Sequence, residues 1–180
     1  MSRLLGAILA GGLSRRFGSD KAVALWRGRP LIDHAVEALR PRVDEVAVCG
    51  RAGGRIGDVY LADRPGPHMG PLGGLCAALY HAREQGYDAV ISVGCDTPAL
   101  PDRLVETLAA AEGAAYLEAL PIIGRWPVSL STGLDHFLAE DRKHAVRLWA
   151  DSVGARPMAW HELPNVNCPA DLQALGASEA

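Results

Sequence analysis

Residues 4–21 read LLGAILAGGLSRRFGSDK, an apolar run that passes directly into a segment rich in glycine and basic residues. The apolar residues 4–10 are typical of a strand that is covered on both faces of a parallel sheet. The adjacent glycines after it let the backbone approach a ligand closely, and exposed backbone amides at such a turn hold phosphate oxygens. Arginines and Lys21 add positive charge. The stretch therefore predicts a buried first strand and a phosphate-binding loop over residues 11–21.

This loop does not match two familiar nucleotide-binding motifs. The dinucleotide fingerprint G-x-G-x-x-G does not fit because Gly11 and Gly12 are adjacent, and a Walker A loop does not fit because Gly18 and Lys21 are not neighbours. The alternative to phosphate binding is a solvated basic turn. The position directly after the first buried strand favours a ligand site, because open α/β sheets bind ligands at the carboxyl ends of their strands.

Beyond the loop, short apolar runs alternate with segments whose apolar residues recur at helical spacing. Strands are predicted at residues 45–49, 58–62, 89–93, 114–117, 128–130 and 157–160, and helices from Pro30 to Pro41, after residue 71, from Pro101, at 134–139, at 145–150 and from Pro169. This alternation predicts a three-layer α/β/α fold, in which helices cover both faces of a mostly parallel sheet. The length of 180 residues, with no evident linker or internal repeat, predicts a single domain over residues 1–180.

The composition argues against several classes of protein. A formal net charge of -3 gives no global reason to expect nucleic-acid binding, and no apolar stretch is long enough to cross a membrane. Residues 4–10 resemble a short signal-peptide core, but the basic, glycine-rich loop after them favours a strand. The cysteines Cys49, Cys76, Cys95 and Cys168 form no C-x-x-C pair, so a zinc site is not expected. Reduced thiols indicate a cytoplasmic protein.

Asp96 is the acidic residue with the clearest context. It lies in CDTPALP, residues 95–101, directly after the apolar run 89–93. A carboxylate at the end of a buried strand can coordinate magnesium, which binds one or two carboxylates together with phosphate oxygens. The alternative is a helix cap or a turn residue, because Asp-Thr-Pro is also good turn chemistry. Asp63 precedes a proline-rich loop and carries little information alone, since most loop aspartates are solvated.

The string LAGGLSRRFGSDK, residues 9–21, resembles the signature loop of the sugar-nucleotide-type nucleotidyltransferases. Within that group it is most similar to the molybdenum cofactor guanylyltransferases. The resemblance spans residues 5–172 and implies a Rossmann-like nucleotide-diphospho-sugar transferase fold. It also implies that Lys21 is the family's essential lysine and Arg16 its arginine, both of them catalytic. Besides Lys21, the GTP-binding residues that it implies in this loop are Leu9, Ala10, Gly11 and Gly12.

The same resemblance gives roles to the acidic residues. The family carries its magnesium aspartate in a C-D-x-P context, which implies that Asp96 is catalytic, binds the nucleotide and holds Mg2+. The family's aspartate that contacts the guanine nucleotide corresponds to Asp63, and the G-P-L-x-G segment that follows is kept at residues 70–74. A carboxylate there could accept the two N–H groups on the guanine edge, for which cytosine offers no equivalent pair.

The tail NVNCPADL, residues 165–172, resembles the family's N-[IV]-N-T-P-x-D-L ending. The resemblance implies that Asn165 and Asn167 bind the acceptor, and the alternative is a structural turn before the last helix. Cys168 replaces the usual threonine. If that position caps the helix, the lost hydroxyl bond costs roughly 1 kcal/mol and leaves the chemistry unchanged.

Two further positions depart from the family pattern. Cys49 stands at the end of the second predicted strand, where the family often has an asparagine that contributes to nucleotide binding. This departure leaves part of the base or ribose recognition open. Trp126-Pro127 stands where histidine-proline is common, in a segment that lies toward the acceptor side, so the acceptor is less well defined than the type of reaction.

The resemblance implies an enzyme that transfers GMP from GTP to molybdopterin and forms the guanine dinucleotide cofactor and pyrophosphate, with Mg2+ as its cofactor. Its expected partners are these two substrates and molybdoenzyme-maturation proteins, with no nucleic acid and no membrane. Three alternatives stay open at this point. They are a molybdopterin cytidylyltransferase, a related transferase with another acceptor, and a nucleotide-binding protein that has lost turnover.

Overall fold

The computed structural model describes residues 2–11, 20–54, 56–67, 69–140, 143–160, 163, 166 and 170–171. Within these residues a seven-stranded sheet has the order β5-β4-β1-β6-β8-β7-β9. Its strands are β1 (Leu4–Leu9), β4 (Glu45–Cys49), β5 (Val59–Leu61), β6 (Ala89–Gly94), β7 (Ala115–Leu117), β8 (Gly124–Pro127) and β9 (Arg156–Met158). A separate hairpin, which the sequence did not predict, pairs β2 (Leu25–Trp26) with β3 (Arg29–Pro30).

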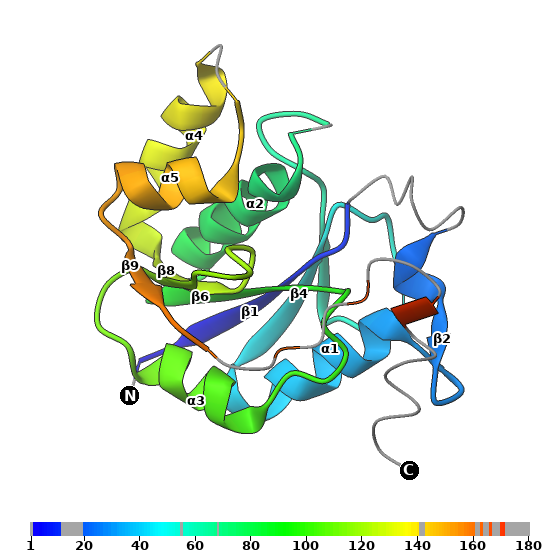
Figure 1. The fold of residues 1–180 in the computed structure, drawn as a ribbon. Coiled ribbons are helices and arrows are strands. Elements are labelled where there is room, and N and C mark those ends of the chain that lie inside the picture. Colours follow the sequence, from blue (N-terminus) through cyan, green and yellow to red (C-terminus); the bar gives the residue numbers. More distant parts are fainter. Residues whose placement is uncertain are drawn as a thin grey trace.

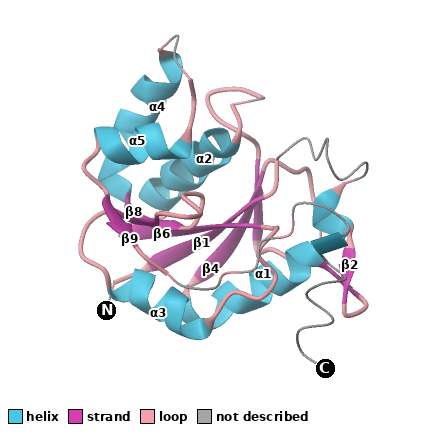
Figure 2. Ribbon diagram, viewed as in Figure 1, coloured by secondary structure: helices cyan, strands magenta, loops and turns pink. Residues whose placement is uncertain are grey.

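The helices connect the strands and cover the sheet. The α-helices are α1 (Leu31–Leu39), α2 (Pro71–Glu84), α3 (Asp102–Ala110), α4 (Ser131–Ala139) and α5 (Val146–Ser152), and the short 3-10 helices are η1 (Lys21–Val23), η2 (Arg40–Arg42) and η3 (Val128–Leu130). Helices α2, α4 and α5 lie on one face of the sheet, and α1 and α3 lie on the other (Figures 1 and 2). The predicted three-layer α/β/α arrangement is confirmed.

Strand β1 lies in the middle of the parallel part of the sheet, and every one of its residues is buried. It pairs in parallel with β4 on one side and with β6 on the other. Alternate side chains enter opposite layers: Leu5 packs with the α2 side, and Ile8 packs with the α1 side. Only an apolar run suits such a position, because both faces of the strand are covered. The C-terminal ends of β1, β4 and β6 consequently lie together at one edge.

The antiparallel strand β8 is the exception in this sheet. It runs against both β6 and β7, while β7 pairs in parallel with β9. The sequence placed a strand at residues 128–130, and this prediction is wrong: those residues form η3, and the strand precedes them. Pro127, with no N–H to donate to a further ladder position, is the last residue of the strand and the N-cap of η3.

Other predicted boundaries are correct to within a few residues. Pro30 and Pro101 each precede their helix by one residue as N-caps rather than opening it. Helix α1 ends at Leu39, before Pro41, as predicted. The start of the last predicted helix, at Pro169, lies outside the described residues. None of the helices in the described part of the chain is long and apolar enough to span a membrane.

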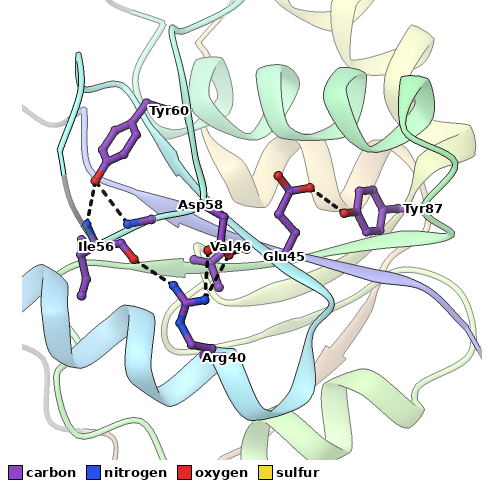
Figure 3. A network of polar contacts seen from close by, with 8 residues as sticks. Arg40, Glu45, Val46, Ile56, Asp58, Tyr60 and Tyr87 are labelled. Carbon is purple, nitrogen blue, oxygen red and sulfur yellow. Dashed lines mark hydrogen bonds and ion pairs between the residues drawn. The ribbon is translucent and has the colours of Figure 1, made fainter.

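Asp58 holds the outer edge of the sheet to the end of helix α1 (Figure 3). Its carboxylate accepts a hydrogen bond from the Val46 N–H at 2.8 Å and one from Arg40 Nη1 at 3.0 Å. Arg40 also donates to the carbonyl of Ile56 at 2.9 Å. Burial acts to raise the pKa of Asp58, but the Val46 and Arg40 hydrogen bonds outweigh it, so the pKa lies below its ordinary value of 3.8.

A carboxylate with a lowered pKa stabilises the fold above its unfolded pKa, and the contribution disappears as the pH falls through the folded pKa. We expect Asp58→Asn, which keeps an acceptor for Val46 but loses the charge that faces Arg40, to cost about 1 kcal/mol at pH 7, because the pair is partly exposed. The melting temperature falls by about 2–4 °C.

Thermal melts measured from pH 7 down to pH 3 check this expectation. The gap between the two proteins should narrow below about pH 5. The exposed Glu112 supplies a matched control, since the melting temperature of Glu112→Gln should stay close to that of the unmodified protein at every pH. A gap that stays constant at low pH would contradict the charge argument.

Candidate active site

Lys21 and Asp96 meet at the edge where the parallel strands end. The Lys21 Nζ atom lies 3.1 Å from Asp96 Oδ2, although the two residues are 75 positions apart in the chain. Both side chains are largely shielded, with 12% of the lysine and 26% of the aspartate exposed. The ammonium and the carboxylate therefore face the same space.

That space is a cavity of about 260 Å³, which we call the main cavity. The predicted nucleotide-binding residues that line it are Leu9, Ala10, Gly11, Lys21, Asp63 and Asp96. Residues that the sequence had not assigned to binding also line it: Asp20, Ala22, Cys95 and Ile122. Asp20 could have been found from its place beside Lys21, but Ile122 carries no signal, because it comes from the connection between β7 and β8.

Asp96 owes its position to the end of strand β6. A Cβ atom on Gly94, the last residue of β6, would lie 2.3 Å from Asp96 Oδ1, so the carboxylate folds back over the space that glycine leaves. Among the described residues, Asp96 Oδ1 is buried without a hydrogen-bond partner. The backbone carbonyl of Asp96 accepts from the Val166 N–H at 2.8 Å, which ties the C-terminal segment to this turn.

The donor chemistry at Asp96 fits a magnesium ion. Mg2+ takes oxygen ligands, usually one or two carboxylates with phosphate oxygens and waters supplying the rest. Asp96 lines the main cavity and has a buried carboxylate oxygen with no partner among the described residues, which has the chemistry of such a ligand. The described residues contain no group of three or more His, Cys, Asp or Glu side chains that could hold a metal. A magnesium here would depend mainly on ligands from the nucleotide.

Asp63 is held between glycines at the other side of the main cavity. Its carboxylate oxygens lie 3.5 and 3.6 Å from where a Cβ on Gly11 would stand, and one of them lies 3.1 Å from that position on Gly50. Its Cβ lies 3.1 Å from the same position on Gly73. A Cβ on Gly50 or Gly73 would crowd Asp63, whereas one on Gly11 would lie at an ordinary contact distance, and Gly50 also needs its positive φ of 78°. The glycines of two separate segments thus make room for one acidic side chain.

The thiols of Cys49 and Cys95 are part of the wall and are chemically inert. Burial, followed by the charge of Asp63, raises the pKa of Cys49 to about 12. Burial and the charge of Asp96 raise the pKa of Cys95 to the same value. Both thiols therefore stay protonated at neutral pH, and neither is a nucleophile. Cys49, Cys76 and Cys95 are all free, as expected for reduced thiols.

Four predicted site residues lie outside the described residues: Gly12, Arg16, Asn165 and Asn167. Their roles stay predictions. Val166, between the two asparagines, is fully buried and packs with Trp26 and Leu31. The N–H of Val166 donates to the Asp96 carbonyl, so Val166 itself lies next to Asp96.

Trp126 belongs to the core. Its side chain is fully buried, and its Nε1–H donates to Ser92 Oγ at 2.9 Å. Ser92 in turn donates to the carbonyl of Ile122 at 2.7 Å. The buried tryptophan therefore does not itself face the acceptor substrate. Its chain of hydrogen bonds does reach Ile122, in the wall of the main cavity.

A mostly parallel sheet with a Lys–Asp pair beside Gly11 is the arrangement expected of a nucleotidyltransferase of the α/β class. The family model described as the MobA-like NTP transferase domain matches residues 6–147. The chain belongs to this family and, within it, to the molybdenum cofactor guanylyltransferases.

Two relatives support this assignment, and a solved structure shares the fold. The molybdenum cofactor guanylyltransferase of Rhodobacter capsulatus is 38% identical, over 94% of this chain and 93% of the relative. The protein of the same name from Acidiphilium cryptum is 32% identical, over 98% of this chain and 95% of the relative. The crystal structure of molybdopterin-guanine dinucleotide biosynthesis protein A from Archaeoglobus fulgidus has the same fold, with a TM-score of 0.76 at 17% identity, covering 98% of this chain and 100% of that one.

The close approach of Gly94 and Asp96 gives a prediction about activity. We expect Gly94→Ala to push the Asp96 carboxylate out of place, because a Cβ cannot lie 2.3 Å from its oxygen. Displacing a catalytic group by about 1 Å costs roughly a hundredfold in rate, so turnover should fall by that order while circular dichroism stays unchanged. Gly66→Ala is the matched control, since a Cβ there meets nothing within 4 Å. Equal turnover in the two variants would contradict the placement of Asp96.

Proposed function

We propose that this protein transfers GMP from GTP to the terminal phosphate of molybdopterin, in the cytoplasm, and releases pyrophosphate. The names of its relatives support the reaction. The observation that carries the proposal is the 3.1 Å contact between Lys21 and Asp96 in the main cavity. One cationic and one anionic group at that distance suit a substrate that brings both phosphate and a divalent cation.

The reaction needs no general base. An oxygen of the acceptor phosphate, already an anion, attacks the α-phosphorus of GTP. A new phosphoanhydride bond forms, and the bond between the α-phosphorus and its bridging oxygen breaks. The electron pair leaves with pyrophosphate. The protein therefore has to align two anionic substrates and offset their charge, and these are the main contributions of proteins to phosphoryl-type transfer.

The proposed roles follow from charge and position. Lys21 offsets charge on the α-phosphoryl group and on the leaving pyrophosphate, with Arg16 beside it in the sequence of the loop. Gly11 and Gly12 present backbone N–H groups to phosphate oxygens. Asp96 holds magnesium, which would bind phosphate oxygens of the nucleotide and neutralise part of their charge. The contact of Lys21 with Asp96 at 3.1 Å supports a shared role for the two residues at the same phosphates.

Base recognition is proposed for Asp63, together with the wall of the main cavity formed by Leu9 and Ala10. A carboxylate fixed in place between glycines accepts two parallel N–H groups, the pattern on the guanine edge. Asn165 and Asn167 are proposed to bind the acceptor, because the tail NVNCPADL resembles the family's ending. Molybdoenzyme-maturation proteins are the proposed recipients of the product.

A nucleotide screen tests the reaction itself. With molybdopterin and magnesium present, we expect GTP to support pyrophosphate release and the formation of a guanine dinucleotide, identified by mass spectrometry. CTP, ATP and UTP should react at least about a hundredfold more slowly, since a site built to hydrogen-bond one base rejects analogues that leave its polar groups unpaired. Turnover with CTP at the rate of GTP would overturn the guanine assignment, and no pyrophosphate release with any of them would overturn the reaction.

Substitutions at the Lys–Asp pair test the site. We expect Asp96→Asn and Lys21→Ala each to lower turnover by roughly a hundredfold or more, the cost of removing one electrostatic group from a transferring centre. The melting temperature should change little. The exposed Lys143 provides the control, because Lys143→Ala removes the same charge away from the main cavity. Full activity of Asp96→Asn at saturating magnesium would remove Asp96 from the metal role, and a lowered melting temperature with intact activity would remove Lys21 from phosphate binding.

A further inference from the structure

Lys21 stands on a short piece of backbone. It opens η1, a 3-10 helix of three residues, and its flexible four-carbon stem does not by itself fix the ammonium in place. The N-cap of η1 is Asp20, whose carboxylate accepts a hydrogen bond from the Ala22 N–H at 3.2 Å. The position of the lysine backbone therefore depends on what holds Asp20.

Arg51 holds Asp20 in an ion pair. Its Nη1 atom lies 2.8 Å from Asp20 Oδ1 and 2.6 Å from Asp20 Oδ2, so one nitrogen contacts both carboxylate oxygens. The two residues are 31 positions apart and belong to different connections, one before η1 and one after β4. The Arg51 side chain is 28% exposed and that of Asp20 is 46% exposed.

The backbone from which Arg51 extends is fixed. The preceding residue, Gly50, donates its N–H to the Leu61 carbonyl at 2.9 Å. Its Cα packs so closely on Gly11 that a Cβ on Gly50 would lie 2.5 Å from the Gly11 Cα. Arg51 also lines a second cavity, of about 490 Å³, which shares Gly11 and Asp63 with the main cavity. The arginine thus starts from a rigid point next to the nucleotide-binding wall.

The four charged groups form an alternating series, Arg51, Asp20, Lys21 and Asp96, in which each acidic residue contacts or adjoins a basic one. The charges of all four groups act on the Cys95 thiol. Burial is the main cause that raises the pKa of this thiol; the two aspartates also raise it, and the two basic residues lower it.

We propose that Arg51 is a positioning residue for the nucleotidyl-transfer site. Through its ion pair with Asp20, Arg51 holds Lys21 in the position from which the lysine binds phosphate. This inference rests on the proposed function, because it takes GTP as the ligand of Lys21. Arg51 acts by reducing the freedom of the lysine, so its loss weakens GTP binding, raises KM and lowers kcat, each by much less than removal of Lys21 itself.

The test measures GTP affinity by titration calorimetry at fixed magnesium, without acceptor, together with KM and kcat. Arg51→Ala should weaken GTP binding about fivefold, the upper range for an exposed ion pair. Asp20→Asn should weaken it equally, because asparagine keeps the cap on Ala22 but loses the charge. Arg51→Lys should stay within about twofold of the unmodified protein, since it restores the ion pair.

Epistasis separates positioning from direct contact. In a Lys21→Ala background, Arg51→Ala should weaken GTP binding no further, because the lysine that Arg51 positions is already gone. The matched control is Arg42→Ala, which breaks a similar ion pair to Glu106 at 2.6 Å between η2 and α3. It should leave GTP affinity unchanged.

Two results would overturn the inference. One is normal GTP affinity in Arg51→Ala, and the other is a full fivefold loss in the Lys21→Ala background, which would make Arg51 a direct contact. If the unmodified protein binds no GTP, the proposed function itself fails and the inference falls with it. Binding of GTP by the unmodified protein with no effect of Arg51→Ala leaves the proposed function standing and removes only the role of Arg51.

Discussion

The parallel pairing of β1 with β4 and β6 is the constraint on which the rest of this structure depends. Each strand in this group ends at the same edge, so the residues that follow β1 and β6 meet there although they are far apart in the chain. Lys21 and Asp96 are brought to 3.1 Å in this way. The burial of β1 on both faces fixes its register against its neighbours, and that register determines where the charged groups stand.

The described lining of the main cavity carries more negative than positive charge. Asp20, Asp63 and Asp96 contribute three carboxylates, and Lys21 offsets one of them. Helix α2 begins at the same place, with its cap Gly70 and its first residue Pro71 in the cavity wall. The partial positive charge at a helix N-terminus, equivalent to about half an elementary charge, favours anions there. A polyanionic substrate in this cavity would therefore depend on such local positive groups and on a divalent cation, because the net charge of -3 provides no attraction.

The parts of the fold that depend on local sequence were predictable. The apolar residues 4–10 and the glycines after them indicated a buried strand and a ligand turn, and Asp96 was predicted from its place after another apolar run. The hairpin β2–β3 was not predictable, because strands this short have no periodicity. Residues 128–130 were misassigned since β-branched and aliphatic residues look alike in a strand and in a 3-10 turn, and the burial of Trp126 is a tertiary property. Ile122 enters the site through contacts that no motif encodes, whereas Asp20 stands beside Lys21 in the loop motif.

Cys49 stands where the family often has an asparagine, and its thiol offers the site different hydrogen-bonding groups. Its pKa of about 12 means that it adds no negative charge to a cavity that is already lined by three carboxylates. A protonated thiol is only a weak hydrogen-bond donor, whereas an asparagine amide offers two strong donors and an acceptor. The close packing of Asp63 against Gly50 and Gly73 fits the proposal that Asp63 takes over part of this recognition, because a pre-organised group loses less freedom when it binds.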